Sequence, residues 1–217
     1  MKTFPVTLKV IPRRCWSQEA LVPVDFSSFP TVSGYLDVNL EVDPLLKGAF
    51  KTSHTGFIKS SGDLPSSLSG EICAKHFYYP GLNGATKRYP GIQEQTFIRS
   101  EVSCLDWARI LLDLTYGFIA NYQGGEKSFS GTIPELRFVE AAVAEVGVEK
   151  YFLIEEWIDT SRAPFKKYIN NGSPVSCIPT TAPEELQNIA NFLCFAQHVQ
   201  YQVTEGTMFT SDYQGLH

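Results

Sequence analysis

A long segment with apolar residues at helical spacing separates two strand-rich parts of this 217-residue chain. From Arg99 to Phe118, apolar residues recur at three- and four-residue steps, which predicts a packed helix over 99–118. Before this helix, residues 1–43 alternate apolar and polar residues between prolines, and the segment 70–81 has the β-branched and aromatic content of a strand. The segment 48–59 predicts a hairpin, because glycine stands at its start and near its middle.

The part of the chain after the helix again supplies strands and a helix. Two strands of a hairpin are predicted over 135–146 and 150–158, because their β-branched and aromatic residues outweigh the helical alternative for the first. Thr181-Ala182-Pro183-Glu184 predicts a capping box at the start of a second helix, with proline just inside it. A last strand is predicted over 207–215. This order predicts an α+β, two-lobed fold with the lobes joined just after residue 158.

Composition narrows the class of protein. The net charge of −5 argues against a surface that coats nucleic acid, and the sequence contains no run of about 20 apolar residues that would span a membrane. The five cysteines are scattered, odd in number and without C-x-x-C spacing, which argues against a disulfide framework or a self-contained zinc knuckle. We therefore expect a cytoplasmic protein in a reducing compartment that has no nucleic-acid or membrane partner.

The first candidate for chemistry is a lysine in the middle of a predicted strand. Lys75 lies among small and apolar neighbours, so its ammonium would leave a sheet face. A phosphate site needs a fixed cation of this kind, held by a carboxylate from a nearby helix, and Glu101 at the helix start could serve. An ordinary surface lysine and a glutamate favoured by the helix dipole would look the same, and residue type alone favours that explanation.

A carboxylate and an amide near the end of the chain form the second candidate. Asp212 and Gln214 are two residues apart on the predicted last strand, so they would project to the same side. Oxygen ligands of this kind suit magnesium, which takes few protein ligands together with substrate phosphates. A turn-capping aspartate before Gly215 is the alternative.

Two further features carry weaker signals. The segment 165–172 combines Lys166 and Lys167 with an Asn-Asn-Gly turn, which could cradle a phosphate but is also a common turn for conformational reasons. His198 lies late in the second predicted helix, where a lone histidine is usually structural, and no second ligand with zinc spacing accompanies it. The glycine-rich nucleotide loops and the common kinase and hydrolase motifs do not occur in the sequence.

Taken in chain order, these segments resemble the alpha-kinase family of atypical protein kinases. GAFKTSH looks like that family's nucleotide-covering loop, and ICAKHF looks like its lysine-bearing strand. FVEAAVAEV and YFLIEEWI look like the hairpin that leads to the adenine hinge, and FKKYINNG is similar to the Phe-x-Lys-Tyr-Asn-Asn loop. ANFLCFAQHVQYQVTEGTMFTSDYQG resembles the histidine-bearing helix and the Asp-x-Gln-Gly strand. The resemblance covers about residues 44–215 and implies a kinase domain over 44–217, with lobes over 44–158 and 159–217 and with 1–43 as a strand-rich extension.

The resemblance implies a set of nucleotide contacts. Lys75 would contact the α- and β-phosphates, and Lys51 in the covering loop would add a second cation. Backbone groups around Glu155, Glu156 and Trp157 would bond the adenine. The remaining nucleotide-binding residues implied are Lys167 in the loop and Glu101 as the helix partner of Lys75.

The resemblance also implies metal ligands and an activity. Gln214, with Asp212 beside it, would bind magnesium, and His198 matches the first of four zinc ligands. The family's Leu-Thr-Asp-Pro segment and its other zinc ligands would lie beyond residue 217, so we expect the C-terminal lobe to stop short after the Asp-x-Gln-Gly strand, without a complete zinc site. The expected function is ATP-dependent serine/threonine protein kinase activity of the alpha type, with ATP and Mg²⁺ as cofactors and a protein as substrate. The alternative is a catalytically inactive module that binds nucleotide or another protein.

Overall fold

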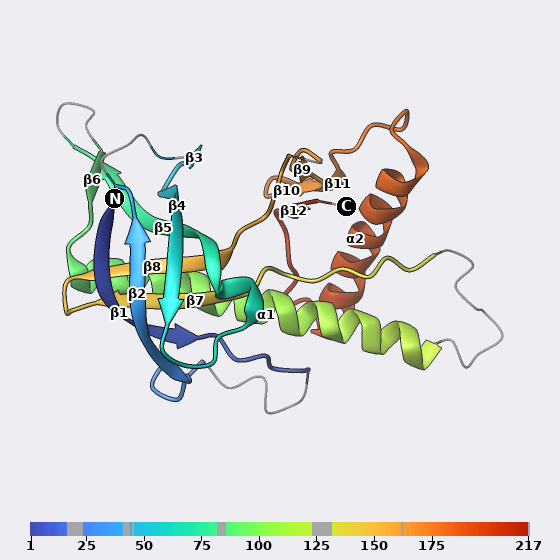
Figure 1. The fold of residues 1–217 in the computed structure, drawn as a ribbon. Helices are drawn as coiled ribbons and strands as arrows, with labels where there is room; N and C mark the ends of the chain where they lie inside the picture. The colour runs from blue at the N-terminus through green and yellow to red at the C-terminus, as the bar shows by residue number, and fades with distance from the viewer. Residues whose placement is uncertain are drawn as a thin grey trace. The chain divides into compact units, whose positions relative to one another are not determined.

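The computed structural model describes residues 1–16, 24–40, 44, 46–81, 86–122, 132–161 and 163–216. The chain divides into two compact units. The first unit comprises Met1–Arg13, Val22–Asp106 and Val139–Ile158, and the second comprises Arg14–Leu21, Trp107–Phe138 and Asp159–His217. Strands make up most of the regular structure in the first unit, and helices most of that in the second (Figure 1).

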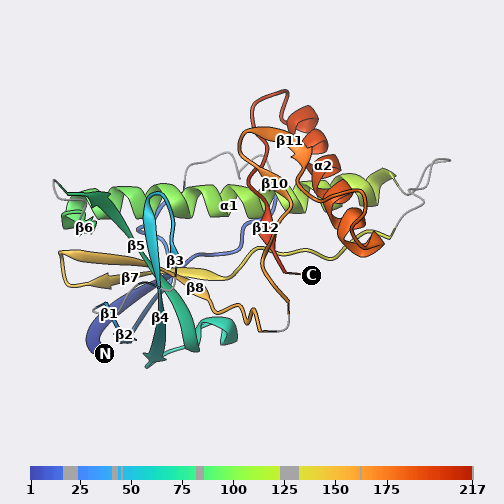
Figure 2. The same cartoon turned by 90° about the horizontal axis from the view of Figure 1, so that it is seen from above.

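Six antiparallel strands of the first unit close into a ring. They are β1 (Lys2–Val10), β2 (Thr31–Val38), β4 (Lys51–Ser60), β5 (Gly70–Pro80), β7 (Ala141–Val146) and β8 (Lys150–Glu156). Each of these strands pairs with two others, in the order β1-β2-β4-β5-β8-β7 and back to β1 (Figure 2). Two short strands extend the ring. Strand β3 (Leu46–Lys47) pairs with β4, and strand β6 (Thr86–Arg88) pairs with β5. The ring fixes the position of each strand from both sides.

The interior of the ring is an apolar core. Its buried members come from all six strands and from the 3₁₀ helix η2 (Ser66–Leu68): Val6, Leu8, Leu36, Val38, Ile58, Leu68, Ile72, Ala74, Ala142, Ala144, Phe152 and Ile154. Strand alternation explains the pattern, because every second residue points inward.

The hairpin predicted over 48–59 lies at the start of that segment, where β3 and β4 pair and the N–H of Gly48 donates to the carbonyl of Lys51 at 2.9 Å. One continuous strand, β4, covers most of this segment, and Gly56 lies within the strand rather than in a turn. A Cβ on Gly56 would stand 2.8 Å from the side chain of Ile72 and 3.1 Å from the carbonyl oxygen of Asp37. The glycine therefore serves close packing between neighbouring strands, which sequence alone does not distinguish from a turn.

Helix α1 (Gly91–Tyr122) packs its first half on the outer face of the ring and is longer than predicted. Its first turns lack an apolar stripe, since Ile92 is 81% exposed. They are anchored instead by Glu94, which is fully buried, forms an ion pair with Arg88 and accepts a hydrogen bond from the N–H of Tyr151 at 3.0 Å. Burial raises the pKa of Glu94 despite the opposing charge of Arg88. A polar anchor of this kind escapes a search for apolar periodicity.

The first strand of the predicted 135–158 hairpin is shorter than expected. Residues 132–140 have no regular structure, and only Ala141–Val146 pair with β8. In the second unit, the hydroxyl of Tyr116 donates to the carbonyl of Pro134 and accepts the N–H of Leu136. Apolar side chains of this stretch pack on the core of the second unit, so its backbone does not enter the sheet.

The second unit is built around the later half of α1 and helix α2 (Glu184–Val203). The short strands β9 (Lys166–Lys167) and β12 (Gln214–Gly215) pair with each other, as do β10 (Ile169–Asn170) and β11 (Ser173–Ser176). The buried core of this unit consists of Leu112, Ile119, Tyr168, Ile169, Leu186, Ile189, Ala190, Phe192, Leu193 and Tyr213. Within the described ranges, neither helix has an apolar stretch long enough to pass through a bilayer.

The predicted capping box does not form. Pro183 occupies the N-cap position of α2 and makes no side-chain cap bond. Gln187 instead donates from Nε2 to the carbonyls of Thr180 and Ala182, at 2.9 and 2.6 Å. The loop before the helix is thus fixed by a side chain from its first turn, and the box spacing in the sequence is coincidental.

A polar network lies on the inner side of β4 and β5. The rings of His54 and His76 stack with centroids 5.3 Å apart, and Thr52 Oγ1 lies 3.2 Å from His54 Nε2 and 3.0 Å from His76 Nε2. The other ring nitrogen of His76 lies 3.2 Å from the carbonyl oxygen of Phe77. Burial first, and then the positive charge of Arg88, lowers the pKa of His76 to about 4, and burial also lowers the pKa of His54.

The depressed pKa of His76 predicts acid sensitivity. The unfolded chain binds a proton near pH 6.5 whereas the folded chain does so only near pH 4, so stability is lost as pH falls between these values. We expect His76→Gln to remove part of this dependence, worth roughly 2–3 kcal/mol between pH 7 and pH 4. Urea unfolding of both proteins across this range measures it, and parallel stability curves would contradict the assignment.

Candidate functional site

The outer face of β5 carries Lys75. In the antiparallel register Lys75 pairs with Ser53 of β4 and with Leu153 of β8, and Cys73 pairs with Glu155. Paired residues share a face and diagonal neighbours lie within reach of long side chains, so the register places Glu155 next to Lys75.

Lys75 and Glu155 form a half-buried ion pair. The ammonium of Lys75 donates to Glu155 Oε2, and the two side chains are 25% and 17% exposed. Burial alone would lower the pKa of Lys75, but the charge of Glu155 and its hydrogen bond outweigh burial and raise that pKa. The lysine is therefore a fixed cation at neutral pH, which is what a phosphate site requires.

The predicted pairing of Lys75 with Glu101 is wrong. Glu101, on α1, accepts a hydrogen bond from Lys51 Nζ at 2.5 Å, and the ammonium of Lys51 lies 5.6 Å from the ring centre of Phe77. The charge of Glu101 still contributes to the raised pKa of Lys75, after that of Glu155. Lys75 thus pairs with Glu155, and Glu101 pairs with Lys51, for which no partner was predicted.

The strand end next to this face holds the residues predicted to bind adenine. β8 ends at Glu156, whose N–H donates to the carbonyl of Glu140 at 3.0 Å, and half-buried Trp157 follows outside the strand. The side chain of Glu156 is buried. Glu155 and Glu156 therefore have different surroundings, and Trp157 is the first residue beyond the strand ladder.

The second unit brings three other predicted residues together. Gln214 pairs with Lys167 in the register of β12 and β9, and Lys167 Nζ donates to Asp212 Oδ1. The side chains of Lys167 and Asp212 are 37% and 45% exposed, so solvent screens this pair. Two oxygen-bearing side chains and a lysine thus stand at one short ladder.

The prediction that Asp212 and Gln214 lie on one strand and project to the same side is wrong. Only Gln214 and Gly215 form the strand, and Asp212 precedes it with a left-handed backbone at φ 63°. Period-two alternation therefore does not determine the direction of the Asp212 side chain. This backbone region is uncommon for residues other than glycine, although aspartate tolerates it better than most.

The metal donors differ in how well they fit. The carboxylate of Asp212 and the amide oxygen of Gln214 are hard oxygen donors of the kind that magnesium takes. His198 is exposed on α2, and the described residues contain no group of three or more His, Cys, Asp or Glu side chains that could hold a metal. A lone imidazole does not fit a structural zinc site, so no role for zinc is derived from these residues.

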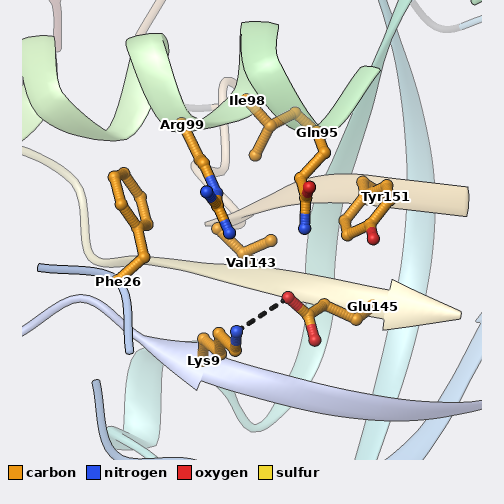
Figure 3. Close-up of a pocket in the computed structure, with 8 residues that line it drawn as sticks. All are labelled: Lys9, Phe26, Gln95, Ile98, Arg99, Val143, Glu145 and Tyr151. Carbon is orange, nitrogen blue, oxygen red and sulfur yellow. Dashed lines mark ion pairs between the residues drawn. The ribbon is translucent and has the colours of Figure 1, made fainter. Parts of the chain in front are cut away.

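A small hollow elsewhere in the first unit is unrelated to these residues. Figure 3 shows it between α1 and the outer face of the strands, where Lys9 and Glu145 form an ion pair of 2.9 Å. Its lining residues are Lys9, Phe26, Gln95, Ile98, Arg99, Val143, Glu145 and Tyr151. With a volume of about 10 Å³ it holds about one water molecule, far less than a nucleotide needs.

Glu155 shows what the sequence interpretation missed. The prediction for this residue concerned backbone contacts with adenine and gave its side chain no partner, whereas its carboxylate pairs with Lys75. The signal lay in the pairing of the strands at 70–80 and 150–156, since a register that aligns Cys73 with Glu155 makes Lys75 its diagonal neighbour. Choosing that register requires the fold.

Comparisons with known proteins agree with the architecture. A model of the alpha-kinase family matches residues 76–217. The structure is similar to a C-terminally truncated alpha-kinase domain of myosin heavy chain kinase, with a TM-score of 0.58 and 13% identity over 100% of this chain and 81% of that one. It is also similar to an alpha kinase from Entamoeba histolytica, with a TM-score of 0.56 and 13% identity over 100% and 73% of the two chains.

A third similar structure contains a nucleotide analogue. It is the alpha-kinase domain of myosin heavy chain kinase A in complex with AMPPCP, with a TM-score of 0.53 and 14% identity over 100% of this chain and 78% of that one. No curated protein matches the sequence. The predicted α+β fold of an atypical kinase is confirmed by these similarities.

The ion pair predicts the acid–base behaviour of Lys75. Glu155→Gln removes the charge that outweighs burial, so we expect the pKa of Lys75 to fall. The pH dependence of acetylation at Lys75, followed by mass spectrometry, measures this change. Glu145→Gln, which removes the partner of Lys9, is the matched control. A Lys75 profile that is identical in the wild type and Glu155→Gln would show that the pair does not control the lysine.

Proposed function

Because the chain belongs to the alpha-kinase family, we propose that this protein kinase transfers the γ-phosphate of Mg-ATP to a serine or threonine hydroxyl of a partner protein. The observation that carries the proposal is the half-buried Lys75–Glu155 ion pair on the outer face of the first unit. A lysine held in this way is a rigid cation with its side-chain entropy already reduced, and phosphoryl transfer depends on positioned charge more than on covalent chemistry.

Lys75 binds the α- and β-phosphates in this proposal. Their oxygens take up hydrogen bonds of the ammonium, while Glu155 keeps the lysine protonated and directs it. Lys51 adds a second cation on the same face, and Glu101 holds it from α1. Each of the two lysines thus has a carboxylate partner.

The second unit supplies the proposed magnesium ligands. Gln214 offers its amide oxygen and Asp212 its carboxylate, and Lys167 balances the charge of Asp212 beside them. Bound magnesium neutralises charge that develops on the phosphate oxygens. Support for this assignment comes from the hard oxygen donors and from their place beside the β9–β12 ladder.

In the proposed reaction the substrate hydroxyl oxygen forms a bond to the γ-phosphorus and its proton leaves to water, while the bond from that phosphorus to the bridging oxygen of ADP breaks. Negative charge grows on the leaving ADP oxygens as the bond breaks. We propose that Lys75 stabilises this charge. Trp157 and the end of β8 are proposed to hold the adenine, because they follow directly on the strand that carries Glu155.

Loss of Lys75 tests the proposal. We expect Lys75→Met to reduce ATP-dependent phosphorylation by at least about 100-fold, because a charge-stabilising donor is lost from the transition state. The measurement is transfer of labelled phosphate to a protein substrate, alongside thermal-shift titration with Mg-ATP. The control is Lys9→Met, since Lys9 also forms an ion pair in the first unit but lies at the unrelated hollow.

Each outcome of that experiment has a separate meaning. Equal activity of Lys75→Met and Lys9→Met would contradict the role of Lys75. Saturable stabilisation of the wild type by Mg-ATP without any phosphate transfer would show an inactive nucleotide-binding module instead.

A further inference from the structure

The segment that carries Asp212 has no regular secondary structure of its own. Residues 208–213 belong to neither a helix nor a strand, yet they lead directly into Gln214. Such a segment holds its shape only if other groups satisfy its backbone. In the second unit these groups are mainly polar side chains of α2.

Two glutamines hold the backbone of Thr210 from both sides. Gln197 donates from Nε2 to the carbonyl of Thr210 at 2.8 Å, and the N–H of Thr210 donates to Gln200 Oε1 at 2.8 Å. The glutamines are three residues apart and so share one face of α2. Together they take the place of the strand ladder that the sequence predicted here.

Gln200 connects more elements than Gln197 does. It is fully buried, with 0% exposure, and its Nε2 lies 3.2 Å from the carbonyl oxygen of Leu111 and 3.3 Å from Thr115 Oγ1 on α1. The same nitrogen lies 3.4 Å from the hydroxyl of Tyr213. One amide group therefore ties α1 and α2 to residues on both sides of Asp212.

Two further hydrogen bonds support the backbone of this segment. The hydroxyl of Thr204 accepts the N–H of Met208 at 3.0 Å, and the carbonyl of Tyr213 accepts the N–H of Tyr168 at 2.9 Å. Asp212 lies between these fixed points with its left-handed backbone at φ 63°. An aspartate keeps that conformation when its flanks leave no alternative.

We propose that Gln200 is a positioning residue for the magnesium site, because it fixes Thr210 and Tyr213 and so directs Asp212 and Gln214. This inference rests on the proposed function, in which these two side chains bind the metal. Groups that orient metal ligands change metal affinity without touching the metal. Gln200 acts in this way from the helix core.

The test measures how much Mg²⁺ the protein needs to bind ATP. Gln200→Met keeps the side-chain length and removes its hydrogen bonds, and Gln202→Met is the matched control at an exposed position of the same helix. We expect Gln200→Met to raise the Mg²⁺ concentration for half-maximal ATP binding about tenfold. ATP affinity in the absence of Mg²⁺ should stay unchanged, which a general loss of stability would not produce. Calorimetric titrations at a series of Mg²⁺ concentrations measure both quantities.

A second variant covers failure of the first to fold. Gln197→Met removes one hydrogen bond to Thr210 and should shift the Mg²⁺ requirement in the same direction by less. If the wild type needs Mg²⁺ and both variants match Gln202→Met, the positioning role is wrong and the proposed function stands. If the wild type shows no Mg²⁺-dependent ATP binding, the proposed function is wrong, and the role of Gln200 falls with it.

Discussion

The half-buried ammonium of Lys75 imposes the constraint on which the first unit depends. Taking a charge out of water is costly unless an opposite charge meets it with good geometry, and Glu155 is that charge. The pairing needs β5 and β8 side by side in one register, which the closed ring of strands enforces from both directions. Fold and site are thus linked at one ion pair, because a shift of register by one residue would turn Glu155 to the other face.

In the second unit, hydrogen bonds rather than a large sheet hold the candidate site residues in position. Asp212 and Lys167 are exposed charges whose mutual attraction is weak in water. Their place is set instead by the buried amides of α2 and by the β9–β12 ladder. Gln200 contributes no charge, yet it decides the path of the backbone on which the charged group stands.

The sequence predicted those elements whose signal is local. The strand around Lys75 was predicted from its β-branched and aromatic content and the helix that follows it from an apolar stripe, and the fold class followed from the order of all the predicted elements. The resemblance to the alpha-kinase family identified residues that the structure then brings together within each unit. Polar anchors such as Glu94 were missed, because a buried carboxylate that starts a helix interrupts the apolar pattern that a search relies on.

What sequence could not supply was the choice of partner. From sequence alone, Glu101 and Glu155 are equally good partners for Lys75. The register of β5 with β8 places Glu155 next to Lys75, and Glu101 pairs with Lys51 instead. The same holds for Asp212, where a strand was predicted but side chains of α2 form hydrogen bonds with the backbone of Thr210. A similar structure with 13% sequence identity shows that the fold tolerates wide sequence change. The side-chain partners within it must therefore be determined from the structure.

The central proposal is that Lys75 binds the phosphates of ATP and that Gln214 binds magnesium. A crystal structure of the protein with manganese in place of magnesium and a non-hydrolysable ATP analogue tests it most directly. We expect triphosphate oxygens within hydrogen-bond distance of Lys75 Nζ, and an anomalous peak at the amide oxygen of Gln214. A triphosphate bound away from Lys75, or a metal peak at another group of oxygens, would contradict the account.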